Sequence, residues 1–364
     1  MASFLIFLLK RLALIPVTFV IVTAVLYSFI YAVPPEERAA LYFPPRLPPA
    51  EVLTETKINN FINGIIAEKG LDKPFPQQYA IWLTGIIKGD WGWSPTFDAP
   101  VLELLRLRTS ATLELTFYAL LTLIPLGLVS GVITGWRPGG SLDHTFRFTA
   151  FMATSIPPFI LGLFLLSIFY VGLGWFSPGR TGFYELSMST STFQHFTGFL
   201  TLDGLLNGRP DITLDAFRRL VLPVFTLSLA HWATLGRVTR VTIINESGKE
   251  YLLAAKARGL MRLSIVWRHA FRNVLAPALT TTYLSITTLI TGVLVIEIIF
   301  DYKGVSELIT KGITGAQFIG TVNIPDTPLA MGFAVYSSLL VVPLMLLLDV
   351  VKAAVDPRIR EGAA

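Results

Sequence analysis

The sequence predicts an all-α membrane protein with six transmembrane helices. Of its 364 residues, 53% are hydrophobic and only 15% are charged, and the mean hydropathy is +0.63. This composition is typical of chains that bury helices in lipid. Six apolar stretches are long enough to cross a bilayer as helices. They cover residues 12–33, 111–135, 148–174, 220–244, 276–300 and 329–351.

Charge and rare residue types exclude several function classes. The formal net charge is +5, but the basic residues gather in loops beside apolar stretches, which favours membrane orientation over nucleic-acid binding. The chain has no cysteine, so disulfides, thiolate catalysis and cysteine-ligated metals are excluded. Its four histidines are far apart and form no His-Glu-x-x-His pair, and we expect no metal site.

Residues 1–33 are expected to form a cytoplasmic N-terminus and the first transmembrane helix. Lys10 and Arg11 precede an uncharged stretch of full bilayer length. The stretch could be a cleaved signal peptide or a retained helix. Pro34 and Pro35 follow it without a small-x-small cleavage pattern, which favours the retained helix.

Residues 34–110 are polar, proline-rich and too long for a turn, so they predict a structured extracytoplasmic segment. Apolar residues repeat at helical spacing within 58–66 and again within 79–87. These repeats indicate two amphipathic helices. Their apolar faces are expected to pack on the outer ends of the transmembrane helices rather than hold a ligand.

Residues 111–364 are expected to hold the other five spans. Pro157 and Pro158 lie in the third span, and their missing backbone donors predict a kink there, which is either a gate or a simple bend. His231 interrupts the fourth span, where it could line an aqueous path or bond to a neighbouring helix. Glu114, Glu297 and Asp349 lie near span ends, where we expect their side chains to reach the interface. Glu297 and His231 are also candidates for lining a translocation path.

The loop between the fourth and fifth spans, at about 245–277, contains a strongly basic segment, Lys249–Pro277. From Arg237 to Arg272 the chain has eight Lys or Arg residues and two Glu. The positive-inside rule therefore places this loop in the cytoplasm.

The same basic segment has the pattern of a short helix with a sharp exit. Tyr251, Ala254, Ala255 and Arg258 follow helical spacing, and Gly259 comes where the backbone would turn left-handed. A second short helix could cover 263–271. The two small alanines would allow another protein to approach closely.

Several motifs of this chain resemble one family. The Ala-Ala-x3-Gly pattern ending at Gly259, with Pro277 eighteen residues later, resembles the cytoplasmic EAA loop of ABC importer permeases of the dipeptide, oligopeptide and nickel branch. The Glu of that signature would fall at Leu253, and Glu250 supplies an acid one turn earlier. Further short sequence motifs resemble the same branch and occur in the same order: GLDKPFPQQY (70–79), GDWG (89–92), PVLELL and TSATLEL (100–115), SIPPFILG (155–162) and DPRIR (356–360).

The resemblance implies a type I ABC importer permease fold in the prokaryotic plasma (inner) membrane, with both termini cytoplasmic. It also implies a homologous second permease subunit, two cytoplasmic ABC ATPases that bind ATP and Mg, and an extracytoplasmic substrate-binding protein. Transport would proceed by alternating access. Peptides are the leading substrate class by resemblance, and nickel, glutathione and sugars are the alternative substrates. The residues implied to couple to the ATPases are Glu250, Tyr251, Ala254, Ala255, Lys256, Arg258 and Gly259.

The sequence leaves two function classes open, a permease subunit driven by separate ATPases and a self-contained carrier or channel. The chain has no G-x4-GK[ST] phosphate loop and no G-x-S-x-G nucleophile elbow, so we do not expect it to hydrolyse ATP or to be an enzyme. The alternative is a self-contained secondary carrier or channel, for which inverted repeats and charged residues at the midplane are typical. We find neither pattern. The basic segment could also serve only to orient the chain.

Overall fold

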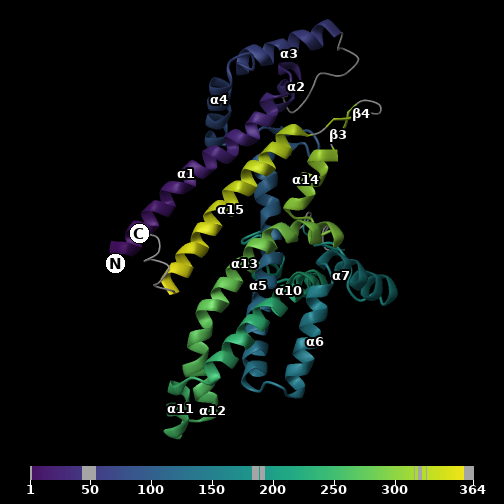
Figure 1. The fold of residues 1–364 in the computed structure, drawn as a ribbon. Helices are drawn as coiled ribbons and strands as arrows, with labels where there is room; N and C mark the ends of the chain where they lie inside the picture. Colours follow the sequence, from purple (N-terminus) through teal and green to yellow (C-terminus); the bar gives the residue numbers. More distant parts are fainter. Residues whose placement is uncertain are drawn as a thin grey trace. The chain divides into compact units, whose positions relative to one another are not determined.

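The computed structural model describes residues 2–42, 55–182, 188, 193–314, 316–318, 322–324 and 326–355. It divides into two compact units. Figure 1 shows the helices and short strands, coloured from the N-terminus to the C-terminus. Unit 1 comprises Met1–Thr109 and Gly304–Leu347, and unit 2 comprises Ser110–Lys303 and Leu348–Ala364. In the described part of the chain helices dominate both units, and strands form only two short antiparallel pairs. The all-α prediction therefore needs only this small amendment.

Unit 1 is built from the N-terminal helices and the last long helix. Its N-terminal elements are α1 (Ala2–Tyr31), α2 (Pro35–Arg38), η1 (Ala39–Tyr42), α3 (Glu55–Lys69), α4 (Phe75–Lys88), β1 (Trp93–Ser94), β2 (Ala99–Pro100) and the start of α5 (Val101–Trp136). The C-terminal elements are α14 (Val305–Thr314), β3 (Ala316–Phe318), β4 (Val322–Ile324) and α15 (Thr327–Val355). Trp93 pairs with Pro100, and Ala316 pairs with Ile324.

Aromatic side chains form the core of unit 1. Tyr27 of α1 is fully buried, and its ring centroid lies 5.0 Å from that of Trp82 in α4. Asp326 fixes the start of α15, because one carboxylate oxygen accepts the Leu329 N–H (3.1 Å) and the other accepts the Ser94 hydroxyl (2.5 Å). The two predicted amphipathic helices are confirmed as α3 and α4.

Unit 2 contains the rest of α5 and the helices between residues 141 and 299. They are α6 (Ser141–Ser155), α7 (Pro158–Leu165), the π-helix η3 (Leu166–Gly172), α9 (Leu200–Leu206), α10 (Pro210–Ser247), α11 (Glu250–Ala257), α12 (Arg262–Ser264), the π-helix η4 (Ile265–Ala270) and α13 (Phe271–Ile299). Leu235 of α10 and Leu289 of α13 are among the fully buried side chains of the unit's core.

Three glycines four residues apart let α5 and α10 approach closely. A methyl group built on Gly131 would lie 2.6 Å from the Gly236 carbonyl oxygen and from Thr239 Cβ, and one on Gly135 would lie 2.7 Å from the Arg240 carbonyl oxygen. Gly127 faces Leu235 at 2.9 Å in the same way. This small-xxx-small pattern is typical of tight helix packing in membranes.

The described residues contain four helices that are long and apolar enough to cross a membrane. Their apolar ranges are Leu12–Tyr31, Val101–Trp136, Arg262–Ile299 and Thr327–Leu347. Helices α6 and α7, with η3 continuing α7, form a fifth candidate span if they are counted together. The chain bends by 99° between them. Helix α10 contains the fourth predicted span but is not among them, since His231 and Arg237 interrupt its apolar stretch.

Two helices extend beyond the spans predicted within them. Helix α5 begins at Val101, ten residues before the predicted second span, and α10 begins at Pro210, ten residues before the predicted fourth span. In both cases the apolar stretch is shorter than the helix that contains it, because polar turns continue the same backbone hydrogen bonding. Some sequence-based predictions fall outside what the structure describes. They concern the DPRIR motif and the side chains of Lys10, Arg11 and Asp349.

Candidate functional site

The basic segment after α10 forms a compact turn at one end of unit 2. Helix α10 ends at Ser247, α11 covers Glu250–Ala257, and the chain returns through α12 and η4 into α13. The predicted helix before Gly259 is confirmed. The separate second helix is not, because 262–270 continues into α13 as helical and π-helical turns without a break.

Gly259 ends α11 with the left-handed turn that the sequence predicts. Its φ is +75°, the Gly259 N–H donates to the Lys256 carbonyl (2.9 Å), and the Leu260 N–H donates to the Ala255 carbonyl (3.3 Å). This pair of bonds is the Schellman arrangement of a helix C-terminus. Apart from the two chain neighbours, no atom lies within 4 Å of the Cβ that a side chain at Gly259 would add, so the requirement for glycine here comes from the backbone conformation.

Glu246 holds the turn together. Its carboxylate accepts hydrogen bonds from the Tyr251 hydroxyl (2.5 Å), from Asn273 Nδ2 (2.9 Å) and from the Lys249 ammonium. Burial raises the pKa of this carboxyl, but the three hydrogen bonds outweigh it and hold the pKa below its ordinary value. For Tyr251, burial and the bond to Glu246 raise the pKa to about 12. One carboxylate therefore joins α10, α11 and α13.

Helix α11 has one buried and one open face. Leu252 is fully buried and Ala255 is 5% exposed, and both pack into the core of unit 2. The open face carries the other residues that the resemblance implies for coupling: Glu250, Tyr251, Ala254, Lys256 and Arg258. The prediction that both alanines face a partner is wrong for Ala255, because it fills space inside the chain's own core.

Leu253, at the signature's Glu position, is 53% exposed. An apolar side chain with this exposure lies on the same open side of α11 as Ala254. The sequence did not identify Glu246 or Asn273 as parts of the turn. Their spacing of 27 residues gave no local pattern, since the chain reversal at Gly259 brings them together.

Pro157 and Pro158 separate two helices instead of kinking one. Helix α6 ends at Ser155, Ile156 is extended, and α7 begins at Pro158, with a bend of 99°. Proline lacks the N–H that would continue α6 and is well placed at the first turn of a new helix, which explains the break.

The two residues predicted as candidates for a translocation path, His231 and Glu297, have different surroundings. His231 is half-buried on α10, and its ring has no recorded hydrogen-bond partner among the described residues. Glu297 is 1% exposed and accepts a hydrogen bond from Thr112 Oγ1 (2.5 Å). The prediction that Glu297 reaches the interface is therefore wrong, while its role in a path stays a prediction.

Glu114 is also buried, contrary to the prediction that it reaches the interface. Its carboxylate accepts bonds from Arg180 Nη2 (2.9 Å), from the backbone and hydroxyl of Thr201 (2.9 and 2.8 Å), and from the Tyr302 hydroxyl (3.2 Å). Burial raises the pKa of Tyr302, which keeps its hydroxyl protonated as a donor. A buried carboxylate is stable here because every partner supplies a hydrogen or a positive charge.

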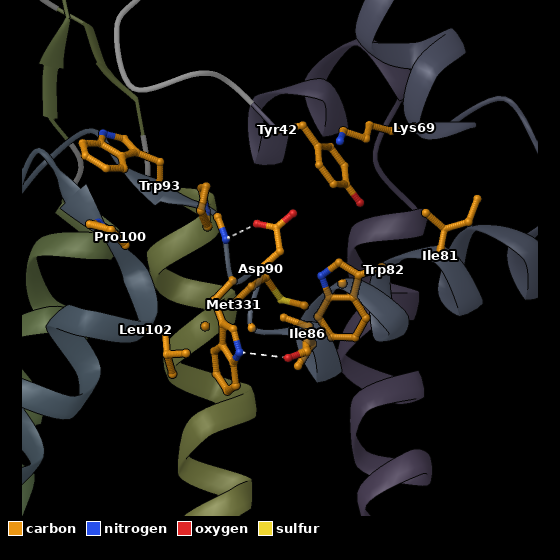
Figure 2. Close-up of a pocket in the computed structure, with 16 residues that line it drawn as sticks. Tyr42, Lys69, Ile81, Trp82, Ile86, Asp90, Trp93, Pro100, Leu102 and Met331 are labelled. Carbon is orange, nitrogen blue, oxygen red and sulfur yellow. Dashed lines mark hydrogen bonds between the residues drawn. The ribbon is translucent and has the colours of Figure 1, made fainter.

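Unit 1 contains a cavity of ≈ 410 Å³ (Figure 2). Figure 2 shows Tyr42, Lys69, Trp82 and Asp90 around it. The Lys69 ammonium lies 5.6 Å from the Tyr42 ring centroid, and the Asp90 carboxylate accepts the Gly92 N–H at 3.3 Å. The Lys69 ammonium pairs with Glu68 (3.2 Å) and not with Asp90, so the cavity offers aromatic surface but no acid–base pair between its own lining residues.

The described residues contain no group of three or more His, Cys, Asp or Glu side chains that could hold a metal ion. The features that remain are α11, whose open face is held in place by the hydrogen bonds of Glu246, and a set of apolar helices.

Comparison with known proteins identifies the family. Residues 124–361 match the family described as Binding-protein-dependent transport system inner membrane component, and residues 4–104 match its N-terminal companion, Binding-prot-dependent transport system membrane comp, N-term. The chain is 33% identical over 316 residues to the probable D,D-dipeptide transport system permease protein DdpB of Escherichia coli (strain K12), covering 86% of this chain and 89% of that one.

Two further relatives agree with this match. The chain is 31% identical over 313 residues to the oligopeptide transport system permease protein AppB of Bacillus subtilis (strain 168), covering 85% of this chain and 89% of that one. It is 30% identical over 359 residues to the di/tripeptide transport system permease protein DppB of Pseudomonas aeruginosa (strain UCBPP-PA14), covering 97% and 98%. The chain thus belongs to the family of inner membrane components of binding-protein-dependent transport systems.

Proposed function

We propose that the chain is the translocation-pathway subunit of an ATP-driven importer of dipeptides or oligopeptides. The named relatives are permeases of D,D-dipeptide, oligopeptide and di/tripeptide transport systems. In this proposal the chain works with a homologous second permease subunit, two cytoplasmic ATPases that bind ATP and Mg, and an extracytoplasmic substrate-binding protein. ATP hydrolysis takes place on the ATPases.

The observation that carries the coupling role is the arrangement around α11. Its open face presents Tyr251, Ala254 and Lys256, while Glu246 ties the helix to the ends of α10 and α13. A displacement of α11 by an ATPase is therefore passed to two long helices, because Tyr251 and Asn273 share one acceptor. A loosely attached loop would instead absorb the displacement.

The proposed topology has six spans and both termini in the cytoplasm. Four are the apolar helices of the described residues, the fifth is the bent pair α6 and α7, and the sixth is α10. The segment 34–110 is then extracytoplasmic. The eight basic residues of 237–272 support a cytoplasmic location for α11.

Alternating access requires helices that can change direction. The break at Pro157 and Pro158 lies between the end of α6 and the start of α7 within one predicted span, and we assign it as the hinge candidate of this unit. His231 and Glu297 remain the candidates for the path. Both are on helices that Glu246 connects, directly or through Asn273, to α11.

Uptake of a labelled dipeptide tests the substrate class. Cells that lack this chain should lose uptake, and the intact chain should restore it. An excess of unlabelled tripeptide should compete, whereas nickel ions, glutathione or a sugar should not. Competition by one of these three solutes, with none by peptides, would replace the peptide assignment and leave the permease assignment intact.

A further inference from the structure

A groove beside the α5–α6 turn has the composition of a lipid site. It lies in unit 2, has a volume of ≈ 620 Å³, and is bounded by the end of α5, the turn to α6 and the segment 261–267. Large apolar side chains line it and remain open to the surroundings. The most exposed are Met261 (77%), Leu263 (68%), Leu142 (66%) and Ile133 (46%), followed by Trp267 (40%).

The groove is also positively charged. Arg137 and Arg262 line it, and Lys256 lies at its edge, since the Lys256 ammonium and the Arg262 guanidinium each lie 5.9 Å from the Trp136 ring centroid. No Asp or Glu is among the lining residues. None of these three cations forms an ion pair with an acid within the described part of the chain. Their charge is therefore available to an external anion.

The groove lies at the ends of two candidate spans, which favours a position near the membrane–water interface. Trp136 is the last residue of one candidate span, and Arg262 is the first residue of another. Trp and Arg are favoured at this depth, where an amphipathic ring and a long cationic side chain can contact lipid and headgroups together. Val132 lies within the span itself, so the apolar wall of the groove continues toward the lipid tails.

We propose that this groove binds an anionic phospholipid from the cytoplasmic leaflet. Arg137 and Arg262 would hold the phosphate, because a guanidinium donates two parallel hydrogen bonds to phosphate oxygens. Met261 and Leu263 would contact the first part of an acyl chain. The exposed apolar side chains favour a lipid over a soluble acidic partner, since a lipid covers them and neutralises the cations at once.

The proposed lipid would act next to the coupling helix. Arg262 and Lys256 belong to α12 and α11, whereas Arg137 follows α5. One phosphate held by these side chains would link the end of α5 to the segment formed by α11 and α12. The inference depends on α5 and α13 spanning the membrane and not on the coupling role of α11.

Tryptophan quenching tests the proposal with a defined probe. The assembled transporter is purified in a neutral detergent and titrated with phosphatidylglycerol that carries a brominated acyl chain, which quenches tryptophans in contact with it. Brominated phosphatidylcholine is the neutral comparison. The variant pairs Arg137→Gln with Arg262→Gln, and the control pairs Arg268→Gln with Arg272→Gln. The control removes the same charge from the same basic region but not from the lining of the groove.

The expected result is saturable quenching by phosphatidylglycerol and weaker, non-saturable quenching by phosphatidylcholine. Each groove cation removed should weaken binding about fivefold, so the double variant should bind about 25-fold more weakly. The control pair should stay within about twofold of the unmodified protein. A Trp267→Phe variant that keeps the charges should lose part of the quenching amplitude without a change in midpoint.

Three outcomes would overturn the proposal. Equal quenching by the two lipids would show no charge recognition, and equal weakening in both double variants would indicate diffuse attraction to the basic surface. Loss of ATPase subunits from the Arg137→Gln, Arg262→Gln complex with unchanged phosphatidylglycerol binding would assign the groove to a protein contact. Recovery of the assembled complex with an unchanged melting temperature establishes that each variant is folded.

Discussion

Replacing Gly259 by Val should uncouple the proposed ATPase contact without unfolding the chain. At φ +75° a β-branched residue is a strong outlier, and the left-handed conformation costs roughly 1–2 kcal/mol for a residue with a Cβ. Apart from the two chain neighbours, no atom lies within 4 Å of the added Cβ, so no close contact at that atom adds to the cost. The cost is relieved by unwinding the exit of α11, which shifts the open face formed by Tyr251 and Ala254.

A Gly259→Asn variant is the matched control, because Asn also enlarges the side chain but tolerates left-handed angles. The assay measures labelled dipeptide uptake and the amount of ATPase that co-purifies with the tagged chain. A shift of 1–2 kcal/mol corresponds to about a 5–30-fold change in an equilibrium constant, so ATPase retention by Gly259→Val should fall clearly below that of Gly259→Asn. Equal uptake and equal retention in the two variants would refute the role assigned to this turn.

Three further predictions address topology, packing and the turn. Asn60→Cys, in a chain with no native cysteine, should react with a membrane-impermeant maleimide added outside intact cells, and protection until lysis would reverse the topology. Gly131→Ala should destabilise the purified complex by about 1–3 kcal/mol through its collision with α10, whereas Gly292→Ala, with open space around it, should not; equal melting temperatures would contradict the packing. Glu246→Ala should cost ~1–3 kcal/mol and lower coupling more than Glu250→Ala. The pKa of Glu246 is lowered in the folded state, so the stability that its carboxylate contributes is complete above the ordinary pKa. That contribution disappears as the pH falls through the lowered pKa. A stability difference between the Glu246→Ala and Glu250→Ala variants that grows toward acid pH would therefore contradict the prediction.

The sequence predicted the helices with uniform apolar stretches well. The first, fifth and sixth predicted spans correspond to α1, α13 and α15, because hydrophobicity and helical hydrogen bonding cover the same residues there. Gly259 was predictable for a related reason, since a left-handed helix exit restricts the residue type at one position.

Features that depend on long-range contact were not predictable from local patterns. Glu114 and Glu297 looked interfacial because they lie near the ends of apolar stretches, yet Arg180 and Thr112 reach them from distant positions in the chain and make burial favourable. The same holds for Glu246 and Asn273. The four-residue spacing of Gly127, Gly131 and Gly135, by contrast, is visible in the sequence and could have predicted the close packing of α5.

Reconstituted transport tests the central claim most directly. The chain is purified alone and with the three kinds of proposed partner, and each preparation is placed in proteoliposomes for measurement of dipeptide uptake. The account predicts uptake only by the complete assembly and only with ATP and Mg, and no ATP hydrolysis by the chain alone, since it has no phosphate loop. Dipeptide uptake by the chain alone, driven by an ion gradient in the absence of ATP, would contradict the account and establish a self-contained carrier.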